Sequence, residues 1–183
     1  MSYTPFLPQV RPVYSTYSPE SLGSELSAVI TVANLNAAQT AGQNLAYFVP
    51  LYLPAAFTVK RFLWFNGATV NGNITMALFS LAGVLQGTST ASTAQSGVSA
   101  MQAAAPSGGN FTVQAGQYLM VIVSDSATAT LVVGNIGSVP GLLRMMGLQQ
   151  EAADYALTSP ATLVAHSTND YVPFIAISSL TTN

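Results

Sequence analysis

The sequence has very little charge. It carries four basic and six acidic residues among 183, so 5% of the chain is charged while 50% is hydrophobic. Soluble globular domains carry roughly 25% charged residues. Copies of such a chain repel one another weakly, and the formal net charge of −2 is small for keeping a domain of this size monodisperse. The sequence therefore predicts self-association, or burial of its surface against partners.

The same scarcity excludes several classes of protein. Only Lys60 and Arg61 are adjacent among the basic residues, so no basic stripe can neutralise nucleic-acid phosphates. The absence of cysteine excludes disulfides and thiolate metal sites. The longest apolar run, residues 45–65, is broken by two prolines and the basic pair, and is therefore no membrane-spanning helix. The first residues lack the basic-then-apolar order of a secretory signal, so we expect an unprocessed chain. Together with the few basic residues and the broken apolar run, this predicts a protein that binds neither nucleic acid nor membrane.

Residues 1–25 differ from the rest of the chain. Prolines at positions 5, 8, 12 and 19 forbid a continuous helix and disfavour a central strand. The aromatic residues between them make the segment too apolar for a free linker, so we predict an extended arm that docks on a neighbouring surface. The candidate partner-binding residues are Tyr3, Phe6, Tyr14 and Tyr17. An edge strand and a disordered tail are the alternatives for this segment.

Residues 26–183 show the pattern of a single β-sheet domain. The Asn-Gly pairs at 66–67 and 71–72 are typical of tight hairpin turns. Apolar and small residues alternate over 74–78, which predicts a strand with one buried face. Residues 117–123 form the most apolar candidate strand, and we expect residues 128–133 to pair with it across a short turn.

Eight or nine short strands predict an all-β fold, a jelly-roll-like antiparallel β-sandwich with an extended N-terminal arm. Within residues 46–53, Pro50 indicates an edge or a bulge, because proline donates no hydrogen bond to a neighbouring strand. One short helix is expected within residues 141–155, where Leu142, Met145, Met146 and Gln149 fall at helical spacing.

Several turn and strand motifs resemble those of phage structural proteins that have a small jelly-roll domain. The resemblance covers roughly residues 40–180 and lies in residues 44–50 (NLAYFVP), 63–73 (LWFNGATVNGN), 92–97 (STAQSG), 115–118 (AGQY) and 171–174 (YVPF). Such proteins are tail-fibre, minor tail or head-decoration components, so the resemblance implies a place in the virion. The turn at 80–83 (SLAG) is often acidic in them, and its neutral sequence here weakens any cation-assisted sugar site.

Residues for catalysis are sparse. The single histidine, His166, could form a triad with a serine and Asp170, but no serine stands in a nucleophile elbow. Glu151 and Asp154 could share a helix face as a carboxylate pair for glycoside cleavage, although solvated acids are the simpler interpretation. The sequence contains no Asp-x-Asp-x-Asp spacing, which would indicate a calcium-binding loop. We therefore expect no enzymatic activity, no cofactor and no metal site.

Aromatic side chains leave one alternative open. Five aromatic residues could stack on sugar, although most such rings in strands belong to a core or a subunit interface. The candidates are Tyr47, Tyr52, Trp64, Tyr118 and Tyr171. The leading hypothesis is a non-enzymatic virion protein, assembled in the host cytoplasm. It would self-associate, as a homotrimer, and bind the major capsid protein or other virion proteins as capsid decoration or cement. The alternatives are a tail or fibre module that binds host surface glycan, and a polysaccharide-degrading enzyme.

Overall fold

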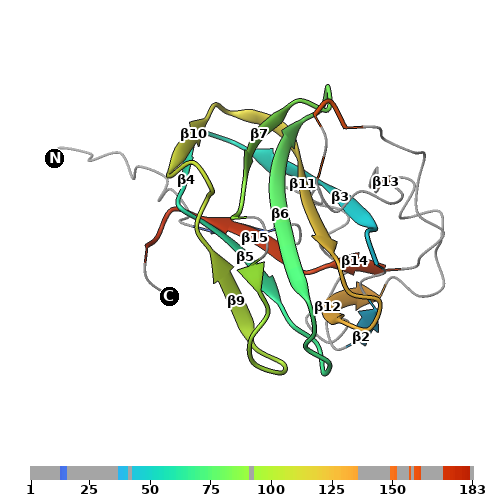
Figure 1. Cartoon of the computed structure of the whole chain (residues 1–183). Helices are drawn as coiled ribbons and strands as arrows, with labels where there is room; N and C mark the ends of the chain where they lie inside the picture. The colour runs from blue at the N-terminus through green and yellow to red at the C-terminus, as the bar shows by residue number, and fades with distance from the viewer. Residues whose placement is uncertain are drawn as a thin grey trace, which may run out of the picture.

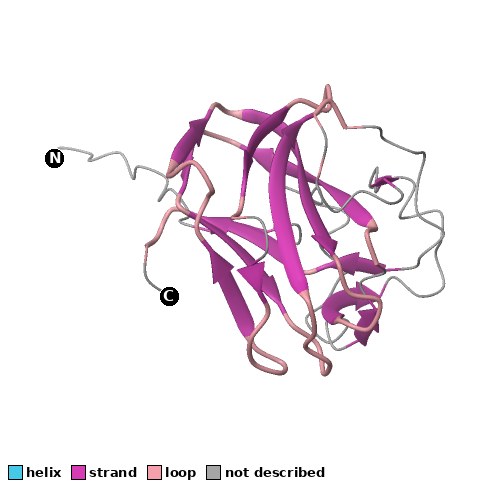
Figure 2. Cartoon of the chain, in the orientation of Figure 1, coloured by secondary structure: helices cyan, strands magenta, loops and turns pink. Residues whose placement is uncertain are grey.

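β-Strands are the only regular secondary structure in the described part of the protein. The computed structural model describes residues 13–15, 37–40, 43–90, 93–135, 149–151, 157, 159–161 and 171–181. These residues contain no helix and form fifteen strands, which are joined by loops and turns (Figure 2). All pairings between strands are antiparallel. The predicted all-β antiparallel fold is confirmed.

Two larger sheets face each other (Figure 1). The first has the order β1 (Val13–Ser15), β15 (Ile175–Ser178), β5 (Arg61–Phe65) and β9 (Met101–Ala104). The second has the order β13 (Gln149–Glu151), β3 (Ala46–Leu53), β11 (Gly116–Ser124), β6 (Asn73–Ser80) and β7 (Leu85–Thr88), and β8 (Thr93–Ala94) also pairs with β6. Two smaller sheets join β10 (Phe111–Val113) to β4 (Phe57–Val59), and β14 (Tyr171–Pro173) to β12 (Thr130–Asn135) and β2 (Ala37–Thr40).

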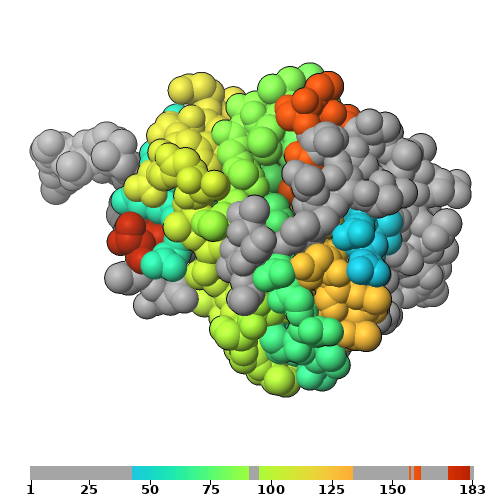
Figure 3. Space-filling model, viewed as in Figure 1, coloured from blue at the N-terminus to red at the C-terminus, as the bar shows by residue number. Residues whose placement is uncertain are grey.

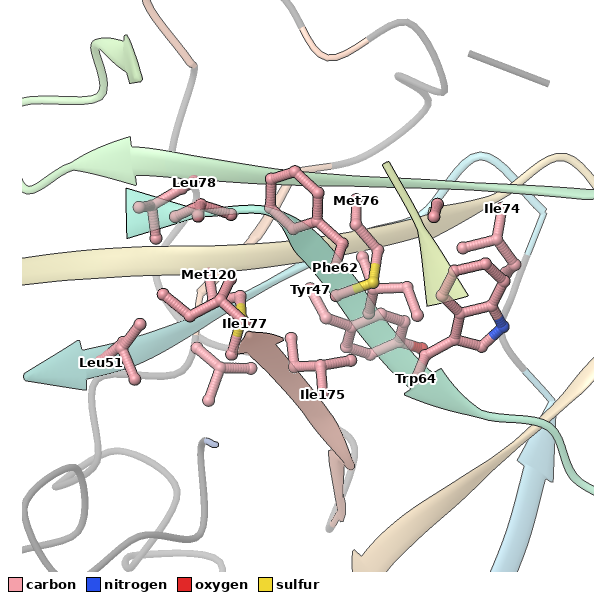
Figure 4. Close-up of a cluster of buried hydrophobic side chains, with 14 of the residues drawn as sticks. Tyr47, Leu51, Phe62, Trp64, Ile74, Met76, Leu78, Met120, Ile175 and Ile177 are labelled. Carbon is pink, nitrogen blue, oxygen red and sulfur yellow. The ribbon is translucent and has the colours of Figure 1, made fainter. Parts of the chain in front are cut away.

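The main core fills the space between the two larger sheets. Alternate residues of β6 point into it, including Ile74 and Met76, and they meet Trp64 and Phe62 of β5 (Figure 4). β3, β11 and β15 supply further large side chains in the same way, and the smaller sheets add others, among them Phe57 and Leu131. Fully burying a side chain of this size contributes about 1.5–3 kcal/mol. Burial of these residues is therefore what holds the two sheets face to face.

The second large sheet is buried on both faces. Phe48, Ala77, Phe79 and Val121 point away from the main core and form a second apolar cluster, in which the rings of Phe48 and Phe79 lie 5.5 Å apart. Leu157 belongs to this cluster, and Figure 3 shows residues 159–161 in orange against the green turn between β6 and β7. The prediction of one buried face over residues 74–78 is therefore wrong, because residues distant in sequence cover the other face.

Two further sequence-based expectations are wrong. Residues 128–133 do not pair with 117–123, because β11 lies between β3 and β6 while β12 pairs with β2 and β14. The helix expected within 141–155 does not extend over Gln149–Glu151, which form β13 on the edge of β3. The rest of that segment lies outside the described residues.

The interpretation of Pro50 agrees with the structure. Its register partner on β11 is Leu119, and β13 pairs with β3 only over Ala46–Phe48. Within the described residues, β3 is thus an edge at Pro50 on the side away from β11.

One buried hydroxyl on the second face gives a stability prediction. Thr75 is 4% exposed beside this cluster, and its Oγ1 has no hydrogen-bond partner among the described residues. Replacing it with the isosteric valine should raise the free energy of unfolding by about 1 kcal/mol, because a buried unpaired polar group costs about 1–3 kcal/mol. Urea denaturation measures the change.

Ser89 provides the matched control. It is also buried, but its hydroxyl accepts a hydrogen bond of 2.9 Å from the backbone N–H of Met76. Ser89→Ala should lower the free energy of unfolding by about 1–2 kcal/mol. A Thr75→Val protein that is less stable than wild type would show that the hydroxyl of Thr75 has a partner.

Candidate functional site

Most of the predicted docking residues lie outside the described part of the chain. Tyr3, Phe6 and Tyr17 fall there, as do the catalytic candidates His166, Asp154 and Asp170. Tyr14 lies in β1, where its register partner on β15 is Ile177. Residues 13–15 thus form an edge strand, which is one of the two alternatives that the sequence left open for this segment. Docking of the aromatic residues on a partner stays a prediction.

The described basic residues lie at the start of β5, two strands in from β1 at the same end of the sheet. Ser178 of β15 pairs with Val13 on one side and with Arg61 on the other. The backbone N–H of Lys60 donates a hydrogen bond of 2.8 Å to the carbonyl of Ser178, and the Arg61 guanidinium donates to the carbonyl of Thr181. We call β1, Ser178, Lys60 and Arg61 the arm edge. Val13, the first described residue of β1, is thus separated from Arg61 by β15.

The aromatic candidates for sugar stacking differ in exposure. Trp64 and Tyr47 are each 1% exposed in the main core, so neither can stack on a ligand. Tyr118 is half-buried, and its hydroxyl donates a hydrogen bond of 2.9 Å to the carbonyl of Gln114. Tyr52, which is 41% exposed, keeps a ring available to solvent. The side chain of Tyr171 lies outside the described residues.

Three loops meet at one end of the sandwich, and we call them the polar loop cluster: residues 66–72, 95–100 and 125–129. They follow β5, β8 and β11 at the lower end of the molecule in Figure 1. The hydrogen bonds within the cluster join uncharged polar groups, except for those accepted by one carboxylate, that of Asp125. The backbone N–H of Ser99 donates to the carbonyl of Gly67 at 2.9 Å, and the amide of Gln95 donates to the carbonyl of Asn71 at 2.8 Å. The loops are therefore held together directly.

Asn66 is the buried centre of this cluster. It has no exposed surface, and its side-chain oxygen accepts a hydrogen bond of 2.9 Å from the indole N–H of Trp64. Its side-chain nitrogen donates to the carbonyls of Ser96 and Gly97 at 3.2 and 3.1 Å. One amide thus links the main core to the neighbouring loop. The sequence indicated Asn66 only as a turn residue. The tryptophan two positions earlier could have indicated its buried role, because a buried indole N–H needs a hydrogen-bond acceptor.

Asp125 is the carboxylate of the cluster. One of its oxygens accepts a hydrogen bond of 2.7 Å from the backbone N–H of Asn73, and the other accepts one of 2.7 Å from the side chain of Asn73. Both oxygens therefore position the start of β6. Within the described ranges, no group of three or more histidine, cysteine, aspartate or glutamate residues could hold a metal ion.

Glu151, the first residue of the predicted carboxylate pair, does not lie on a helix. Glu151 lies in β13, so the helical spacing that would have placed it on one face with Asp154 does not apply at that position. The argument for a glycosidase pair at these two residues is thereby lost.

Gly72 is the position of the cluster least tolerant of a side chain. Its φ is +68°, and a Cβ added there would lie 2.3 Å from a carboxylate oxygen of Asp125. Gly72→Ala should therefore lower the free energy of unfolding by about 2 kcal/mol or more, the sum of a left-handed backbone and a steric clash. Thermal unfolding measures the loss.

Gly108 offers the matched control, because an added Cβ there meets nothing within 4 Å. Gly108→Ala should change the free energy of unfolding by less than about 0.5 kcal/mol. Equal effects of the two substitutions would mean that Asp125 does not approach Gly72 as closely as described.

Comparison with known proteins adds no assignment. No protein-family model matches the chain, and no curated protein matches it. Among the described residues, no helix is both long enough and apolar enough to cross a membrane.

Proposed function

We propose that this chain is a non-enzymatic structural protein of a phage virion, self-associating and bound to the capsid exterior as decoration or cement. The observation that carries the proposal is the strand order. If the main strands β1, β3, β5, β6, β7, β9, β11 and β15 are counted from first to eighth, the two sheets read 1-8-3-6 and 2-7-4-5. That order is the one expected of a jelly roll, an architecture common in viral capsid and lectin domains. The motifs that resemble phage structural proteins point to the same class.

The character of the surface supports assembly. Only Lys60, Arg61 and Asp125 are charged among the side chains that the structure describes, and Asp125 and Arg61 are engaged within the chain. The larger apolar side chains exposed to solvent are Tyr52, Leu81, Val84, Val98, Met101 and Leu180. A surface with few charges and several exposed apolar side chains loses little solvation when it is covered by a partner.

The arm edge supplies a geometry for attachment. β1 is the outermost strand of its sheet, so a segment joined to its start could reach a neighbouring subunit without displacing another strand. Residues 1–12 include Tyr3 and Phe6, and fully extended they could span about 40 Å. Such a segment can add apolar contact across the boundary between two capsid subunits, which is how a cement protein holds a shell.

The copy number of the protein in purified particles tests the proposal. Quantitative mass spectrometry should give a ratio to the major capsid protein near one if the chain covers the shell. A ratio of a few per cent would contradict decoration of the shell and place the chain on the tail. Absence from purified particles would reject a structural role in the virion altogether.

The alternative function is a receptor-binding module on the tail or a fibre, which recognises host surface glycan. The exposed ring of Tyr52 favours it, as do the hydroxyl and amide groups of the polar loop cluster, because sugars bind to rings and to uncharged polar groups. A glycan array probed with the assembled protein tests this function. Binding that is lost in Tyr52→Ala would support it, and an array without any bound glycan would contradict it.

A further inference from the structure

The two Asn-Gly pairs of the polar loop cluster have opposite environments. Asn66 has no exposed surface and its amide makes three hydrogen bonds, whereas Asn71 is exposed and its amide makes one, of 3.0 Å, to the hydroxyl of Thr128. The following glycines differ in the same way. The backbone N–H of Gly67 donates to the carbonyl of Thr130 at 2.8 Å, but that of Gly72 has no acceptor among the described residues.

This difference decides which asparagine can react with its own backbone. In an Asn-Gly pair, the glycine nitrogen attacks the side-chain carbonyl carbon of the asparagine, and the C–N bond to the amide breaks. Ammonia leaves with the proton from the glycine nitrogen, and a five-membered succinimide remains. Water then opens the ring at either carbonyl and gives aspartate or isoaspartate. The net change is one water consumed and one ammonia released.

We propose that Asn71 is a site of spontaneous deamidation and that Asn66, in the same cluster, is protected by the fold. At Asn71 the attack requires the loss of one solvent-exposed hydrogen bond to Thr128. At Asn66 it requires the loss of three bonds in a buried site and withdrawal of the nucleophilic nitrogen from Thr130. The native chain therefore carries one reactive and one protected copy of the same dipeptide.

The product would change the cluster in two ways. The new carboxylate takes the formal net charge of the chain from −2 to −3 and stands in the loop that contacts Asp125. Gln95 also spans the reacting bond, because its side chain donates to the carbonyl of Asn71 at 2.8 Å and its backbone N–H donates to the carbonyl of Gly72 at 3.3 Å. In isoaspartate the main chain runs through the former side chain: a methylene is added between the Cα of residue 71 and the peptide bond to Gly72, and the carbonyl that accepts from Gln95 becomes a carboxylate branch. The spacing of the two acceptors of Gln95 therefore changes. Deamidation of Asn71 is thus a covalent modification that loosens the loops.

The test is an incubation of the full-length protein at mildly alkaline pH, followed by peptide mapping that separates aspartate from isoaspartate at each position. In the native protein Asn71 should convert and Asn66 should convert at least about tenfold more slowly, since each 1.36 kcal/mol of added barrier is a factor of ten. In denaturant the two should convert at similar rates, because only the fold distinguishes them. Equal rates in the native protein, or an Asn71 that stays unmodified while the denatured chain reacts, would overturn the proposal.

Two variants make the test specific. Asn71→Gln removes the reaction at this position, because glutamine would have to close a larger ring. The more acidic form of the protein that accumulates slowly during incubation should then be absent from isoelectric focusing. Thr128→Ala removes the hydrogen bond that holds the reacting amide and should accelerate the conversion of Asn71 without affecting Asn66. An acidic form that persists in Asn71→Gln would assign the charge change to another residue and reject the site.

Discussion

Replacement of Asn66 by alanine is expected to lower the free energy of unfolding by about 3 kcal/mol, because it leaves several buried polar groups without partners. The indole N–H of Trp64 loses its acceptor in a site that is 1% exposed, and the carbonyls of Ser96 and Gly97 lose their donor. Few surface-loop asparagines carry such a penalty. The effect follows from burial, since an exposed amide is replaced by water at little cost.

Urea denaturation, followed by tryptophan fluorescence, measures this loss. Trp64 is the single tryptophan of the chain, so its emission reports on this site alone. Asn71→Ala is the matched control in the same cluster, and it should cost less than about 1 kcal/mol because Asn71 is exposed. If the two alanine variants were equally stable, Asn66 would not be the buried centre of the loop cluster.

Deletion of residues 1–12 is expected to abolish attachment to capsid shells while leaving the sandwich folded. The deletion removes Tyr3 and Phe6 but keeps β1, whose three residues pair with β15. Co-sedimentation of the truncated chain with shells that lack the protein measures attachment. Thermal unfolding, monitored by Trp64, checks that the body keeps its core. The expectation rests on the proposed function, in which these residues extend the contact across the shell.

A longer deletion separates the role of the arm from that of β1. Removal of residues 1–20 also exposes the edge of β15, so this variant should unfold at lower temperature and aggregate more readily. Gly108→Ala, whose added Cβ meets nothing within 4 Å, serves as a control on the body and should bind shells as wild type does. Normal attachment of the chain that lacks residues 1–12 would show that Tyr3 and Phe6 do not carry the attachment.

Local patterns predicted the strands well and their partners less well. Apolar runs and alternation located β6 and β11, because the hydrophobicity pattern of a strand is a local property of the sequence. The pairing of residues 128–133 with 117–123 was wrong because the chain leaves one sheet after Ser124 and enters another. Whether a short turn makes a hairpin or such a crossing depends on contacts with β2 and β14, which are distant in sequence.

The polar loop cluster was foreseen only in part. The two Asn-Gly pairs lie in the loop between β5 and β6, and the tight hairpin turns predicted there are wrong because these strands belong to different sheets. The sequence also gives both pairs the same meaning, whereas burial and hydrogen bonding distinguish Asn66 from Asn71. The roles of Asp125 and Gln95 depend on loops from three separate stretches of chain. Such contacts exist only after the sheets have formed, so no local pattern encodes them.

The position of β15 between β1 and β5 also sets the order in which the protein can be completed. During translation, β5 leaves the ribosome more than a hundred residues before its neighbour β15 does. Until residues 175–178 emerge, β1 has no strand to pair with and one edge of β5 is open. Pairings between such distant segments form slowly. We therefore expect the sandwich to close only after residues 175–178 have been synthesised, so that a nascent chain stalled before them would expose an unpaired apolar strand to chaperones or to other copies.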